Sequence, residues 1–213
     1  MTHSYYSGET SLTNLPGPRP YAGHVTESDD PHLVNVLGAF ALVMADAIRH
    51  ATEAEAGVSG AAPAALIALR QFLAGRSTED IAQATGLTHS GAVRLIDRLV
   101  DGGLVERHPG RDARSLSIVL TAKGRASSRR ISQARATAIK TLIEGLSGED
   151  RRALVVIVDA LVTTATAQRL SARERGEEPV GWLCRLCDLA SCGRPEGHCP
   201  AATTARATQP AGP

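Results

Sequence analysis

A chain of 213 residues with 3% aromatic side chains has the length of one domain with appendages, but few large groups to fill an isolated core. Its formal net charge of +1 neither indicates nor excludes a nucleic-acid partner. The N-terminus has no basic-then-apolar segment that ends in a cleavage site, and charged residues or glycine interrupt the longest apolar runs. The sequence therefore predicts a cytoplasmic protein without a membrane partner.

The predicted elements begin after a flexible N-terminal arm, residues 1–30, in which Gly, Pro, Ser and Tyr follow no period. Over 31–60 apolar residues recur three and four positions apart, which predicts a helix with a continuous apolar face. A second helix is expected to begin near Pro63 and to end at Gly75. The apolar faces of these helices need a partner surface, and an alanine-rich chain of this kind often completes its core with a second copy.

The segment 61–121 has the order of a winged helix-turn-helix. Ser77 opens a short helix that stops at Gly86, and Thr88 caps the next helix, which ends at Gly102. Two short strands, 104–107 and 115–120, flank a turn rich in charge and glycine. The predicted fold class is mainly α with a small β-hairpin wing.

Two longer helical patterns complete the chain up to its cysteine-rich end. One begins near Ala122 and runs to Gly145, and the second runs from a new cap at Ser147 to about Arg173. The predicted organisation is an arm (1–30), an N-terminal dimerisation helix (31–60), the winged domain (61–121), C-terminal dimerisation helices (122–175), a cysteine-rich tail (176–200) and a disordered end (201–213).

Local charge and the place of the second short helix indicate DNA binding. Residues 88–130 carry nine Lys and Arg against four Asp and Glu. In a helix-turn-helix the second helix enters the major groove with its N-terminal side chains, and cations on the wing reach phosphates or the minor groove. Asp97 and Arg98 are interpreted instead as a pair on the helix surface. The candidate DNA-contacting residues are Thr88, His89, Ser90, Gly91, Arg94, Arg111, Asp112 and Arg114.

The same segments give the chain its resemblance to a known family. Residues 87–99, 103–107, 112–114 and 120–124, in this order and spacing, resemble the MarR family of regulators, and the match extends over about 31–172. The resemblance implies an obligate homodimer whose N- and C-terminal helices interlock, with two recognition helices on a pseudo-palindromic duplex. Many members release DNA when a small phenolic molecule binds or a cysteine is oxidised, but no residue here identifies an effector pocket.

The expected function is that of a sequence-specific transcriptional regulator, a repressor, rather than an enzyme. No Ser/His/Asp set, phosphate-binding glycine loop or pair of carboxylates can be assembled from the sequence. A second interpretation is a metal- or cluster-bearing redox or protein-interaction module that kept the winged helix without DNA binding. The basic hairpin and the polar N-terminus of the second helix favour DNA.

All four cysteines of the chain lie in the tail, with the spacing C-x2-C-x4-C-x6-C. Their number within so short a segment indicates a metal site, and four thiolates suit zinc or an iron–sulfur cluster. The spacing decides between neither of these, and unmetallated thiols or a disulfide switch are a third alternative. His198 is interpreted as a bystander, and a site shared across the dimer stays open. The candidate ligands are Cys184, Cys187, Cys192 and Cys199.

Overall fold

The structure, a computed structural model, describes residues 31–110, 116–177 and 181–208. It divides into two units, 1–40 and 41–213, which are described separately. The described part of the first unit is the beginning of helix α1 (Pro31–Ala56), and the rest of this helix belongs to the second unit. The second unit contains all the other elements.

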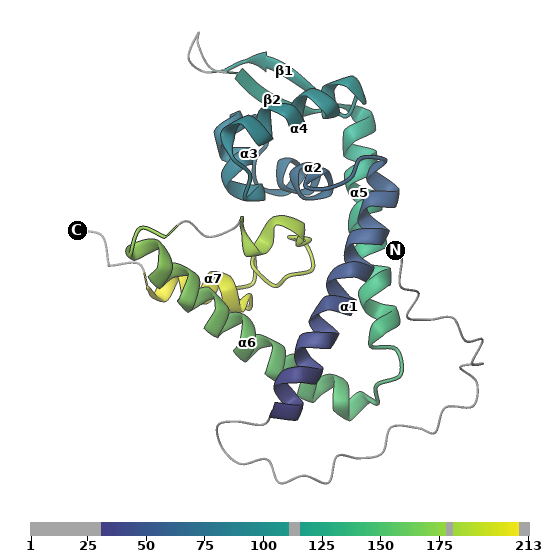
Figure 1. The fold of residues 1–213 in the computed structure, drawn as a ribbon, viewed down its shortest axis with the longest axis vertical. Helices are drawn as coiled ribbons and strands as arrows, with labels where there is room; N and C mark the ends of the chain where they lie inside the picture. Colours follow the sequence, from purple (N-terminus) through teal and green to yellow (C-terminus); the bar gives the residue numbers. More distant parts are fainter. Residues whose placement is uncertain (1–30, 111–115, 178–180, 209–213) are drawn as a thin grey trace, which may run out of the picture. The chain divides into compact units, whose positions relative to one another are not determined.

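The centre of the second unit is a winged helix-turn-helix, as the sequence predicts (Figure 1). The two strands form one antiparallel hairpin, in which Val105 lies opposite Leu120 and Pro109 lies opposite Leu116. Arg76 adds a single bridge to Ile118 at the edge of this hairpin. The elements are α2 (Ala62–Gln71), α3 (Thr78–Thr85), α4 (His89–Asp101), β1 (Val105–Pro109) and β2 (Leu116–Leu120).

Short-range signals set the limits of the two helices of the motif. The Ser77 hydroxyl accepts a hydrogen bond from the Asp80 amide and the Asp80 carboxylate accepts one from the Ser77 amide, which is a complete capping box. Gly86 ends α3 in the left-handed conformation with φ of 74°, where glycine has no steric penalty. The predicted caps at Ser77 and Thr88 are therefore confirmed.

The core lies between α2, α3, α4, the hairpin and the first half of α5 (Ala122–Leu142). In α4 the buried stripe includes Ile96 and Leu99. Ala92 and Leu95 are buried, whereas Val93 is only half-buried. The largest fully buried side chains include Leu66, Ile67, Leu69, Ile81, Leu95, Ile96, Leu99, Ile118 and Ile131.

A close backbone approach joins the hairpin to α5. The Thr121 hydroxyl accepts a hydrogen bond from the Gly124 amide at 3.0 Å and donates one to the Gly103 carbonyl at 2.7 Å. A Cβ atom at Gly124 would lie 1.9 Å from the Leu104 carbonyl oxygen. Only glycine fits there, so this position fixes the angle between the wing and α5.

The last part of the chain holds α6 (Gly148–Glu174), a short 3-10 helix η2 (Leu183–Leu186) and α7 (Pro200–Ala207). The prediction that residues 201–213 are disordered is wrong for 201–207, which lie in α7. Proline at the first helical position and the alanines that follow favour a helix here, and α7 packs against α6 (Figure 1).

Helices α1 and α6 expose much of their apolar surface. Both are long and apolar enough to cross a membrane by length and composition alone, although the sequence predicted that their apolar runs fall short of a span. Isolated charged residues interrupt these runs without lowering the average hydropathy below that of a spanning segment. Exposed apolar side chains include Leu37, Leu42 and Val43 in α1, and Val155, Val156, Ile157, Val158 and Leu161 in α6.

Candidate nucleic-acid interface

The outward face of α4 carries polar side chains suited to reading DNA. Because Ala92, Leu95, Ile96 and Leu99 form its buried stripe, the opposite face carries Ser90, Arg94 and Asp97, which are all exposed. Of the residues predicted from the sequence, Ser90 and Arg94 thus share one solvent-facing surface, a turn apart.

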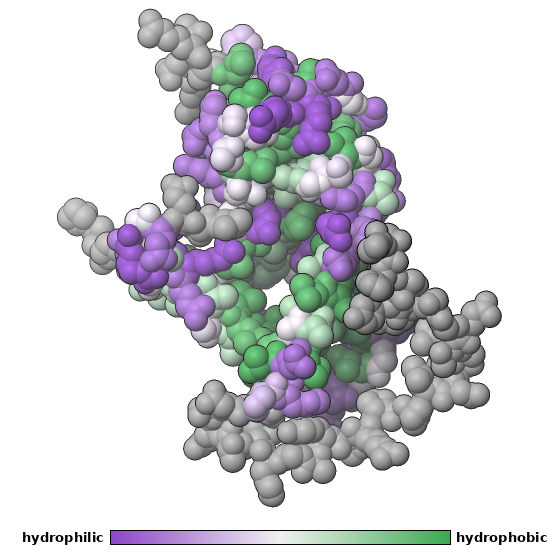
Figure 2. Space-filling model, viewed as in Figure 1, coloured by the Kyte–Doolittle hydropathy of each residue, from purple (hydrophilic) through white to green (hydrophobic). Residues whose placement is uncertain are grey.

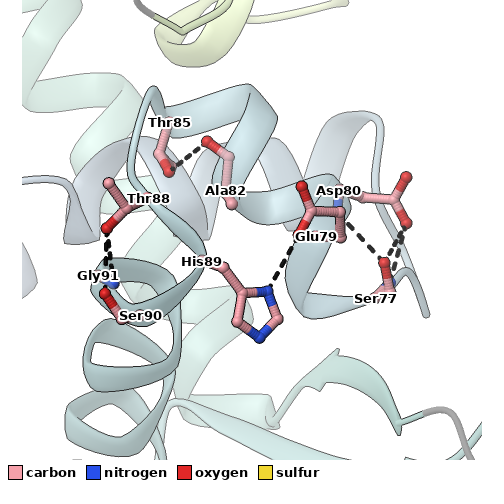
Figure 3. A network of polar contacts seen from close by, with 9 residues as sticks. All are labelled: Ser77, Glu79, Asp80, Ala82, Thr85, Thr88, His89, Ser90 and Gly91. Carbon is pink, nitrogen blue, oxygen red and sulfur yellow. Dashed lines mark hydrogen bonds and ion pairs between the residues drawn. The ribbon is translucent and has the colours of Figure 1, made fainter.

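Thr88 acts as the N-cap of α4, as the sequence indicated. Its hydroxyl accepts a hydrogen bond from the Gly91 amide at 3.1 Å and lies 3.3 Å from the Ser90 hydroxyl (Figure 3). The backbone N–H groups of His89 and Ser90 have no acceptor among the described residues. Two donors at the positive end of the helix dipole are therefore free to bind an anion.

His89 turns away from the Ser90 and Arg94 face. Its Nδ1 atom lies 3.0 Å from Oε2 of Glu79, and both side chains are exposed (Figure 3). The contact joins the N-terminal turns of α3 and α4. It places His89 beside the candidate surface, where a solvent-screened pair contributes little to stability.

The basic side chains of α4, β1 and α5 differ in whether another group of the protein binds them. The Arg107 guanidinium pairs with Asp97. The predicted surface pair between Asp97 and Arg98 therefore does not form. Arg94 has no hydrogen bond or ion pair with another described residue. Lys123, Arg125 and Arg130 are bound to the Gly102 carbonyl, the Leu120 carbonyl and the Glu55 carboxylate.

Arg107 is a residue that sequence analysis missed. It comes from β1 and holds the hairpin against α4 through its pair with Asp97. Its signal in the sequence is weak, because a basic residue next to a strand has many other uses. The predicted contacts at the tip of the wing, Arg111, Asp112 and Arg114, lie outside the described residues.

The cysteine-bearing segment packs against the winged domain. Trp182 and Leu186 contact the core, and the Gln71 amide donates a hydrogen bond to Asp188 at 3.0 Å. The guanidinium of Arg194 lies 5.9 Å from the centre of the Phe72 ring. The tail is therefore attached to α2, and it is part of the described fold rather than a loose appendage.

The four cysteines are free thiols in this structure. Cys199 is buried and the other three are half-buried. A hydrogen bond between the thiols of Cys184 and Cys187 lowers the pKa of Cys187 to about 6 and raises the pKa of Cys184. Over the described part of the chain, no group of three or more His, Cys, Asp or Glu side chains stands in an arrangement that could hold a metal ion.

Comparison with known proteins finds a family model that matches the winged domain. A family model described as the MarR family matches residues 56–115. Over these residues the winged helix-turn-helix of this chain is similar to the MarR family. MarR-family proteins are transcription regulators rather than enzymes, and they are soluble DNA-binding proteins. No curated protein matches the sequence.

Several solved structures share the fold. The RV1404 protein of Mycobacterium tuberculosis is 22% identical with a TM-score of 0.56, covering 65% of this chain and 96% of its own. YusO of Bacillus subtilis is 21% identical with a TM-score of 0.54, covering 63% and 97%. The transcriptional repressor CouR, solved bound to a 23-mer DNA duplex, is 27% identical with a TM-score of 0.50, covering 64% and 99%.

Proposed function

We propose that this chain is a transcriptional repressor that binds a pseudo-palindromic operator as a homodimer in the cytoplasm. The observation that carries the proposal is the outward face of α4, where Arg94 is exposed and has no partner among the described residues. An arginine that no acidic group neutralises, on the second helix of a helix-turn-helix, is placed for contact with base edges or phosphate. The repressor CouR, solved with DNA, supports this function.

The chemistry of the contact follows from the groups at the start of α4. The free N–H groups of His89 and Ser90 can donate to one phosphate, which sets the depth of the helix in the groove. Arg94, a turn further on, then reaches the base edges, where its guanidinium donates two hydrogen bonds to a guanine. The Asp97–Arg107 pair links β1 of the wing to α4, so that the two elements can meet the duplex together.

The exposed apolar faces of α1 and α6 support the homodimer. Ile157 is 55% exposed and Leu161 is 50% exposed, one turn apart on α6. Green hydrophobic surface follows the course of α6 in the space-filling view (Figure 2). Contiguous apolar surface of this kind marks an interface, and its burial by a second copy explains why these helices are apolar without a membrane.

The test is selection of bound sequences from a randomised duplex library by the full-length protein, followed by fluorescence anisotropy on the enriched duplex. We expect an inverted repeat, a complex with two chains per duplex, and an affinity that falls steeply with salt. Arg94→Ala should weaken binding by about 10- to 100-fold. Arg152→Ala removes the same charge from the start of α6 and serves as the matched control.

The outcomes separate the proposal from the alternative of a winged module without DNA binding. Failure to enrich any sequence, or equal effects of the two arginine variants, would contradict the proposed reading by α4. The repressor role has its own measurement, a reporter gene with the enriched site across its promoter. Reporter output that rises or stays constant when the protein is expressed would contradict repression while leaving DNA binding intact.

A further inference from the structure

The segment from Gly181 to Ala207 contains every cysteine of the chain and lies outside residues 56–115, where the family model matches. It has little apolar material of its own. Only Trp182 and Leu186 of this segment pack against the core, and its two helical elements are short. A segment with so few buried apolar groups needs another source of stability to keep one conformation.

The first two cysteines lie in one tight turn. The Cys187 amide donates a hydrogen bond to the Cys184 carbonyl at 2.9 Å, and the two thiols also share a hydrogen bond. Two residues separate them, as in the paired cysteines of many zinc sites. Both side chains are half-buried and approach each other, which is the arrangement in which two sulfur atoms bind one ion.

The last two cysteines are brought together by a closed loop. The His198 amide donates a hydrogen bond to the Gly193 carbonyl at 2.7 Å, and Gly193 adopts φ of +69°. Cys192 precedes this loop and Cys199 follows it directly. The wide spacing in the sequence therefore becomes a second pair in the fold, because the residues next to each cysteine are hydrogen-bonded to each other.

The two pairs are close to each other. Cys184 lines one cavity together with Arg194 and Ala201, which lie two residues after Cys192 and Cys199 respectively. The positive groups of Arg194 and Arg135 act on Cys184 and Cys187, and so favour negative charge there. Four thiolates around one divalent ion carry a net charge of −2, which such arginines would offset.

We propose that Cys184, Cys187, Cys192 and Cys199 of one chain bind a single Zn²⁺ ion, which holds the Gly181–Ala207 segment folded against the winged domain. Ligands in two turns, each closed by a backbone hydrogen bond, suit a tetrahedral thiolate site. Binding requires the four thiols to come closer together, since among the described residues they do not form a group that could hold a metal ion.

Zinc is favoured over a cluster by the tight turn that holds Cys184 and Cys187, in which the Cys187 amide donates to the Cys184 carbonyl at 2.9 Å. At a Zn–S distance of about 2.3 Å, tetrahedral geometry sets neighbouring sulfurs about 3.8 Å apart, which two cysteines of one tight turn can reach. The cysteines of a four-iron cluster each bind a different iron, so their sulfurs lie farther apart. The compact first turn therefore fits one ion better than a cluster.

As a consequence, the metal-bound segment would connect α6 to the helix-turn-helix. The peptide group between Gly181 and Trp182 uses both of its polar atoms. Its carbonyl accepts a hydrogen bond from Arg169 of α6 at 2.7 Å, and its N–H donates to the Ala84 carbonyl at the end of α3 at 2.9 Å. Cys184 is two residues further on, so a metal-held turn keeps this peptide in place.

The experiment uses the full-length protein purified without oxygen, with metal and sulfide analysis and the emission of Trp182, the single tryptophan of the chain. We expect one zinc per chain and no sulfide. Removal of zinc by a chelator should shift Trp182 emission to longer wavelength as the segment leaves the core, and added Zn²⁺ alone should restore it.

Two variants and one control locate the ligands. Cys187→Ser and Cys192→Ser each remove one ligand from a different pair, and each should lose most of the zinc during dialysis against a weak chelator. Ser191→Ala changes an exposed residue of the same segment and should retain one zinc. Far-UV circular dichroism on every variant shows whether the winged domain is still folded, so that loss of zinc is not confused with unfolding.

Three results would overturn the proposal. Metal-free protein with native Trp182 emission would show that the segment folds without an ion. Iron with sulfide would replace zinc by a cluster. Full zinc retention in Cys192→Ser would remove the second pair from the ligand set. None of these readouts involves DNA, so the proposal stands or falls independently of the proposed repressor function.

Discussion

Gly181 lies so close to Ala84 that a Cβ atom on the glycine would stand 3.1 Å from the Ala84 carbonyl oxygen. The carbonyl carbon of Thr85 and the amide nitrogen of Gly86 are as near, and Gly181 has φ of +69°. The tail thus meets the turn between the two helices of the motif with backbone against backbone. A Cβ atom would fit only if the two backbone segments moved apart by a few tenths of an ångström.

The first prediction is that Gly181→Ala releases the tail from this turn. The left-handed conformation alone costs an alanine about 1–2 kcal/mol, and the crowding against Ala84 adds to that. A total of about 2 kcal/mol raises the undocked population roughly thirtyfold. The measurement is a shift of Trp182 emission to longer wavelength. Gly176→Ala is the control, because Gly176 has φ of +77° with nothing within 4 Å, and an equal shift there would refute steric docking.

Much of the winged domain is predictable because its signals are local. The cap at Ser77, the left-handed Gly86 and the cap at Thr88 each act within four residues, so a linear sequence displays them fully. Which positions of α4 are buried is not decided by neighbouring residues in the sequence alone. It depends on how α4 meets its neighbours, which decides that Leu95 is buried while the equally apolar Val93 is only half-buried.

The docking of the tail is beyond sequence reasoning for a physical reason. Gln71 and Asp188 are joined by a hydrogen bond although 117 positions separate them in the chain. A glutamine or an aspartate in a sequence does not predict such a distant partner. The spacing of the four cysteines marks them as a group, yet the loop between Cys192 and Cys199 depends on the His198–Gly193 hydrogen bond, which no spacing rule predicts.

Gly124→Ala should destabilise the winged domain strongly. Its new Cβ would lie 1.9 Å from the Leu104 carbonyl oxygen, and backbone atoms on both sides must separate to make room. We expect a loss of at least about 3 kcal/mol in the free energy of unfolding, or a fall in Tm of roughly 6–12 °C. Thermal unfolding followed by circular dichroism measures this. Gly145→Ala adds the same methyl group in open space, and a comparable loss there would rule out the steric cause.

Substitution of Thr88 should lower stability, whereas substitution of Ser90 should weaken DNA binding alone. Thr88→Ala removes the acceptor of the Gly91 amide and should cost about 1 kcal/mol of stability. Ser90→Ala leaves that cap in place and changes an exposed residue of the reading face, so stability should stay within about 0.5 kcal/mol. DNA affinity should nevertheless fall in Ser90→Ala. Urea unfolding and anisotropy on the selected duplex measure the two effects, and unchanged affinity in Ser90→Ala would exclude that hydroxyl from the interface.

Leu161→Glu should dissociate the proposed homodimer while the winged domain stays folded. Leu161 is half-exposed in one chain, on the same face of α6 as Ile157, so a second copy that covers this face would have to bury the introduced carboxylate. Burial of an unpaired charge costs several kcal/mol, enough to weaken association by about a hundredfold or more. Thr163→Glu adds the same charge two positions along, on the opposite face, and should leave the dimer intact. Sedimentation velocity distinguishes the two variants, and a dimeric Leu161→Glu protein would place the interface elsewhere than on this face of α6.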